Sequence, residues 1–140
     1  MDISLNYYYW HEVAGPMSYF SSGKFEFSEE DLLLLLSSVE PYTSSSESSL
    51  TGPYYLRDQV IFTYNRNLNY PDAQDERIQL MGTDSWVLLS CEKENQLVLE
   101  SLLEIVKLIL DVEFGCCEEV SQLNIQVGQD TSKAIRDIYS

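Results

Sequence analysis

The sequence has one histidine, and this scarcity restricts the catalytic chemistry open to it. A serine or cysteine nucleophile needs a base and an orienting group, so any such site would have to use His11. No Gly-x-Ser-x-Gly elbow accompanies it. We therefore expect no catalytic residues and no enzyme activity, and we interpret His11 as a half-exposed residue at the end of a strand.

Cysteine is also scarce, with three residues at positions 91, 116 and 117. An odd number with two adjacent members makes a poor disulfide framework. Together with His11 they add up to four zinc ligands, but the C-x2-C spacing is missing, and adjacent cysteines seldom both reach one tetrahedral ion. The acidic run at 72–76 lacks the central glycine and the terminal glutamate of an EF-hand. We expect free thiols, no metal and no cofactor.

Basic residues number only eight against 23 acidic ones, which gives a net charge of −15. Such a field repels phosphate backbones and anionic membranes, and the chain has neither a Gly-rich phosphate loop nor a basic patch interleaved with aromatics. We expect no nucleic-acid partner and favour a basic protein partner. Two alternatives stay open: a solvated acidic surface that keeps the protein soluble, and an acidic mimic of nucleic acid.

Long apolar runs are absent, and the N-terminus has no cationic segment followed by an apolar one. We therefore expect a cytoplasmic protein without an integral membrane segment. The length of 140 residues suits a single domain, 1–140, that buries about two-thirds of the surface of its unfolded chain.

The first third of the chain predicts a hairpin and a helix. Residues 3–10 alternate as a strand does, Gly15 and Pro16 break the pattern as turn residues, and strand-forming residues then resume. Ser28 is a suitable helix N-cap, because acidic residues and five consecutive leucines follow it. The serine-rich stretch 40–53 predicts a mobile loop.

The middle of the chain predicts three antiparallel strands. Residues 54–65 form the first, a loop follows, and residues 77–91 form two strands that fold back across positions 82–84.

The strongest helical pattern covers residues 94–115, with Gly115 as its natural end. Polar residues form one narrow stripe, at positions 96, 100, 104, 107 and 111, and apolar residues occupy the rest. A stripe so narrow predicts cover on more than one side, by the sheet and by either the C-terminal tail or a partner. The tail has helical spacing from Val120 to Val127, and a further turn or two is expected after Gly128. Our candidate interface residues are Leu99, Leu103, Val106 and Leu110.

These elements predict an α+β fold with a five-stranded antiparallel sheet and helices packed on it, in the order β-β-α-β-β-β-α-α. This order is similar to the longin fold, which roadblock and profilin-like domains approach. The opening stretch, in which Gly15 and Pro16 join two strands, resembles the start of the regulatory longin domains of folliculin, the nitrogen permease regulators and the DENN proteins.

The resemblance implies a noncatalytic platform that forms a homo- or heterodimer with another longin or roadblock domain and binds or regulates a small GTPase. It supplies no arginine finger for GTPase activation, because no motif of that kind surrounds Arg57, Arg66, Arg77 or Arg136. The alternative is a small-molecule-sensing domain of the profilin or PAS-like type, with a pocket between the sheet and the long helix.

Overall fold

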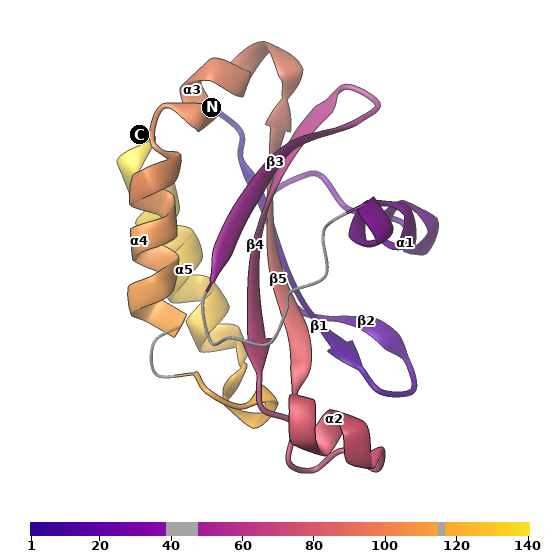
Figure 1. The fold of residues 1–140 in the computed structure, drawn as a ribbon. Coiled ribbons are helices and arrows are strands. Elements are labelled where there is room, and N and C mark those ends of the chain that lie inside the picture. The colour runs from indigo at the N-terminus through magenta and orange to yellow at the C-terminus, as the bar shows by residue number, and fades with distance from the viewer. Residues whose placement is uncertain (39–47, 115–116) are drawn as a thin grey trace.

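The computed structural model describes residues 1–38, 48–114 and 117–140. It has a five-stranded antiparallel sheet with helices on both faces, which confirms the predicted class and strand number (Figure 1). The strands lie in the order β2-β1-β5-β4-β3, so that β2 and β3 form the edges. Their bounds are β1 Ser4–His11, β2 Gly15–Ser22, β3 Ser49–Leu56, β4 Gln59–Leu68 and β5 Thr83–Glu92.

Helix α1 lies on one face of the sheet, whereas α4 and α5 lie side by side on the other (Figure 1). The helices are α1 Glu29–Ser38, α2 Glu76–Met81, α3 Gln96–Glu100, α4 Leu103–Glu113 and α5 Ile125–Ile138, with short 3-10 turns at Lys93–Asn95 and Val120–Gln122. Within the described ranges, none of the helices has the length and apolarity needed to cross a membrane.

The inner strands β1 and β5 are largely buried on both faces. On β1, Tyr7 points to the α4 and α5 side, and its hydroxyl lies 2.6 Å from Thr131 Oγ1 of α5. The next residue, Tyr8, points to the α1 side and packs in a second apolar cluster with Trp86 and Leu32. The sheet therefore separates two cores, and the larger one lies under α4 and α5.

The predicted first hairpin and first helix are confirmed, but residues 12–14 form the turn, and the predicted turn residues Gly15 and Pro16 are already paired with β1 at the start of β2. Gly15 begins β2 at a φ of 75°, a value that suits glycine. Ser28 caps α1, because its Oγ accepts a hydrogen bond from the Asp31 amide at 3.1 Å. The Asp31 carboxylate accepts one in return from the Ser28 amide at 3.4 Å, which completes a reciprocal cap.

The prediction of one strand over 54–65 is wrong. The chain reverses at Arg57 and Asp58, which places residues 54–56 in β3 and residues 59–65 in β4. Arg57 adopts a φ of 53°, so a non-glycine residue makes this tight turn without the usual sequence signal. Residues 49–53 of the predicted serine-rich loop also belong to β3, and its positions 40–47 lie outside the described residues.

The prediction of a strand over 77–81 is also wrong, because these residues form α2. Asp75 caps this helix by accepting a hydrogen bond from the Arg77 amide at 2.9 Å. At the other end the Gly82 amide donates to the Ile78 carbonyl at 2.8 Å. The number of strands is still five, because the predicted strand 54–65 is two strands and the predicted strand 77–81 is a helix.

The predicted long helix is two helices, α3 and α4, separated at Ser101 and Leu102. Its expected end at Gly115 lies outside the described residues. The tail forms more helix than predicted, since α5 runs through Gly128 for 14 residues. It packs against both α4 and β2, and therefore covers one side of α4.

Candidate functional site

The outward face of α4 is apolar. Its exposed residues include Ile105, Leu108 and Val112, which are 44%, 63% and 74% exposed. Their spacing of three and four residues places them on one side of the helix. Isolated exposed hydrophobic residues are common, but a row of three along an eleven-residue helix forms a continuous stripe.

The neighbouring helix α5 presents a polar surface instead. Apart from Ile125 at its first position, its exposed residues are Gln126, Gln129, Asp130, Lys133 and Asp137. Both helices cover the same face of the sheet and lie in the same layer (Figure 1). The apolar stripe is therefore a feature that α4 does not share with α5.

The four residues predicted as an interface lie on α3 and α4, on the side that faces away from the exposed stripe. Leu99, Val106 and Leu110 are fully buried in the larger core, and Leu103 is partly buried against it. Leu99, Val106 and Leu110 pack α3 and α4 on the sheet and are not accessible to a partner, whereas Leu103 keeps part of its surface exposed. The spacing identified an apolar face correctly, but a sequence pattern does not say which of two apolar faces meets the sheet.

The predicted polar stripe of this segment runs along edge strand β3. At one end, the Tyr55 hydroxyl of β3 donates to Gln96 Oε1 of α3 at 3.1 Å. Gln96 Nε2 in turn donates to the carboxylate of Glu100 at 2.9 Å. These contacts join α3 to the edge of the sheet.

At the other end, Asp111 of α4 accepts hydrogen bonds from the Tyr64 hydroxyl at 2.7 Å, from Lys107 Nζ at 2.9 Å and from Ser48 Oγ. Burial alone would raise the pKa of Asp111, but these hydrogen bonds more than offset it and lower the pKa. Burial and then the Asp111 carboxylate raise the pKa of Tyr64, which is therefore a neutral donor.

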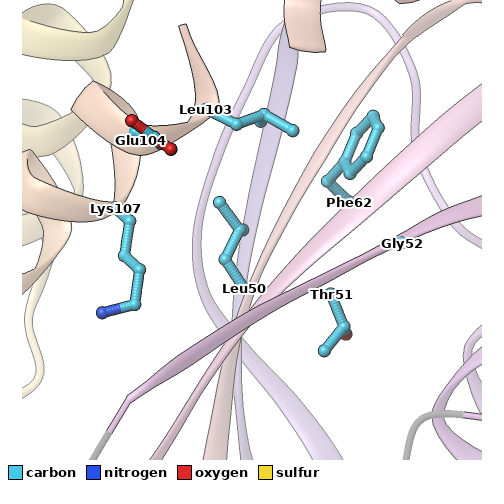
Figure 2. Close-up of a pocket in the computed structure, with 7 residues that line it drawn as sticks. All are labelled: Leu50, Thr51, Gly52, Phe62, Leu103, Glu104 and Lys107. Atoms are coloured by element: carbon cyan, nitrogen blue, oxygen red, sulfur yellow. The ribbon is translucent and has the colours of Figure 1, made fainter.

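A small apolar pocket of about 240 Å³ lies between these two polar contacts. Figure 2 shows Leu103 reaching from the start of α4 toward Phe62 of β4, with Leu50 of β3 below Leu103. Thr51 and Gly52 of β3, together with Glu104 and Lys107 of α4, complete the lining. The pocket lies at the β3 edge of the sheet, beneath the start of α4.

The two charged residues of the pocket differ in their partners. Lys107 is paired with Asp111, so its charge is matched locally. Glu104 is exposed, and no hydrogen bond or ion pair joins it to another residue in the described part of the chain. Glu104 lies between the pocket and the apolar stripe on the surface of α4, and it leaves an unmatched negative charge there.

The structure keeps the potential zinc ligands apart. His11 lies at the β1–β2 turn, where its Nδ1 accepts hydrogen bonds from the Val13 and Ala14 amides, both at 3.1 Å. Cys91 is a free thiol buried near the far end of β5, and Cys117 is buried in the larger core. Cys116 lies outside the described residues. Among those described, no group of three His, Cys, Asp or Glu residues could hold a metal ion.

Sequence reasoning missed the residues of the exposed stripe. The signal was present, because Ile105, Leu108 and Val112 have the same regular spacing as the buried residues. Both faces of α4 are apolar, so only the position of the sheet distinguishes the buried face from the exposed one.

No known protein family matches this chain, and no characterised protein or solved structure matches it.

Proposed function

We propose that this chain is a noncatalytic protein-interaction domain whose partner binds the outward face of α4. The observation that carries this proposal is the contrast between two neighbouring helices: α4 exposes Ile105, Leu108 and Val112, whereas α5 exposes polar side chains. An apolar stripe left in water promotes association, and on soluble proteins such patches typically mark interfaces.

The architecture is consistent with a longin-like domain of the regulatory type. A first hairpin, a helix on one face and two C-terminal helices on the other are what that resemblance implies. The additional helix α2 and the break between α3 and α4 depart from the simple order. On this proposal the partner is another longin or roadblock domain or a small GTPase, and the complex is a dimer.

The test compares three baits in quantitative affinity capture from cell extract. Leu108→Asp with Val112→Asp places two charges on the α4 face, and Gln126→Asp with Gln129→Asp places the same charges on α5. All four positions are exposed, so both variants should keep the fold. We expect proteins that wild type and the α5 variant retain and the α4 variant loses. Identical captures by all three baits would contradict the proposal.

The second candidate function is small-molecule sensing, which the pocket between β3 and α4 favours by its position. Its volume of about 240 Å³ is below the roughly 300–1,000 Å³ of typical ligand sites. A ligand would therefore be small and apolar. Native mass spectrometry of the purified chain tests this, with Leu103→Trp as the variant that fills the pocket. A bound mass lost in that variant would favour sensing over protein interaction.

A further inference from the structure

We propose that the outward face of α4 binds an amphipathic helix that carries a lysine or arginine beside its apolar side chains. The inference rests on the proposed function and adds the partner's secondary structure and charge. It depends on the spacing of the exposed stripe and on the charges that flank it.

The spacing of the stripe suits a helix as the partner. Ile105, Leu108 and Val112 stand at i, i+3 and i+7, which is the a-d-a pattern of a heptad. The outer positions are β-branched and the middle one is leucine, a combination that favours packing of two helices. The eleven residues of α4 extend for about 16 Å, or three turns, enough to align a short helix.

The charges beside the stripe select a basic partner. Glu104 and Asp111 each directly precede a stripe residue, and so occupy the flanking position that sets partner choice in paired helices. Asp111 is matched by Lys107 and by hydrogen bonds from Ser48 and from Tyr64 of β4. The unmatched charge is Glu104, and a cation on the partner would pair with it at the edge of the apolar contact.

A second copy of this chain fits the same surface poorly. Each copy carries a net charge of −15, and a second α4 would bring another Glu104 to the contact. Like charges at an interface cost free energy and slow association. Charge complementarity therefore favours a basic helix from a different protein.

The experiment selects ligands from a phage-displayed library built on one helical scaffold. Its seam positions are fixed as isoleucine and leucine, and the positions flanking the seam are randomised. The baits are wild type, Glu104→Lys, Leu108→Asp, and Asp137→Lys as a control with the same charge change on α5. All three substituted residues are exposed, and circular dichroism confirms that each bait is folded.

We expect wild type and Asp137→Lys to enrich lysine and arginine at the flanking positions, and Glu104→Lys to shift the enrichment to aspartate and glutamate. A selected basic peptide should bind Glu104→Lys at least about 2- to 5-fold more weakly than wild type, because an exposed ion pair worth that factor is lost and the new lysine adds repulsion. Leu108→Asp should enrich nothing.

The outcomes separate this inference from the proposed function. Peptides that require Leu108 but show no preference for basic residues overturn the inference and leave the α4 interface intact. So do peptides that still prefer lysine and arginine on Glu104→Lys. Peptides that bind Leu108→Asp as tightly as wild type contradict both the inference and the proposed α4 interface. Absence of enrichment on wild type overturns the helical partner, while affinity capture decides separately whether α4 binds another kind of protein.

Discussion

The hydroxyl of Tyr139 donates a hydrogen bond to the backbone carbonyl of Leu99 at 2.6 Å, across forty residues of sequence. In a continuous helix that carbonyl would accept from the Leu103 amide. Here the Leu99 carbonyl accepts hydrogen bonds from the Tyr139 hydroxyl and, at 3.5 Å, from the Leu102 amide. The helix breaks at residues 101–102. The Tyr139 hydroxyl thus satisfies a carbonyl that has lost its helical partner at the break between α3 and α4.

Replacing Tyr139 by phenylalanine should lower the free energy of unfolding by about 1 kcal/mol, because a partly buried hydrogen bond is lost. Urea denaturation measures the change. Tyr55→Phe is the matched control: its hydroxyl bonds Gln96 at an exposed site, so we expect a loss below about 0.5 kcal/mol. Equal losses in the two variants would show that Tyr139 does not hold the end of α3.

The protein should lose stability at alkaline pH through its buried tyrosines. Burial raises the pKa of Tyr139 to about 12 and also raises the pKa of Tyr7 and of Tyr19. A phenol whose pKa is higher in the folded state stabilises the fold fully below its unfolded value of about 10. That contribution is lost as the pH rises from about 10 through 12. Unfolding free energies measured across this range should fall, and less steeply in Tyr139→Phe; a flat profile would contradict the burial of these hydroxyls.

Gly128→Ala should destabilise the protein even though alanine favours helix by about 1 kcal/mol. Gly128 is buried in α5 against β2, and an added Cβ would lie 2.6 Å from Phe20 Cβ and closer still to its ring. The helix would have to move outward, at a cost of about 1–3 kcal/mol. Thermal melts measure the loss. Phe20→Leu in the same chain should recover part of it, and a Gly128→Ala variant as stable as wild type would contradict the close approach.

At the first hairpin, Gly15→Val should destabilise more than His11→Ala. A branched residue at a φ of 75° costs about 1–3 kcal/mol. His11→Ala removes two hydrogen bonds that its Nδ1 accepts from turn amides at an exposed site, and should cost less than about 1 kcal/mol. Thermal melts of both variants decide the order. The reverse order would mean that the imidazole, and not the glycine, fixes this turn.

The sequence by itself determined the elements whose signals are local. The turn at Gly15, the cap at Ser28 and the alternation of β1 follow from the preferences of neighbouring residues, and they hold in the structure. The α+β class and the number of strands were also predicted correctly, although the hairpin at Arg57 and the helix α2 were not. Arg57 carries no glycine signal for its turn, and in α2 the cap at Asp75 prevailed over the strand pattern of 77–81.

Only the tertiary structure decided which face of α4 is free. Leu110 and Leu108 are alike in kind and only two positions apart, yet one is fully buried and the other largely exposed. Hydrophobic burial is non-directional, so a helix with apolar residues on both sides gains by packing either side on the sheet. Contacts from distant segments decide the outcome: Tyr139 bonds to Leu99 at the end of α3, α5 covers one flank of α4, and Tyr64 of β4 holds Asp111. These contacts leave the stripe of Ile105, Leu108 and Val112 facing outward.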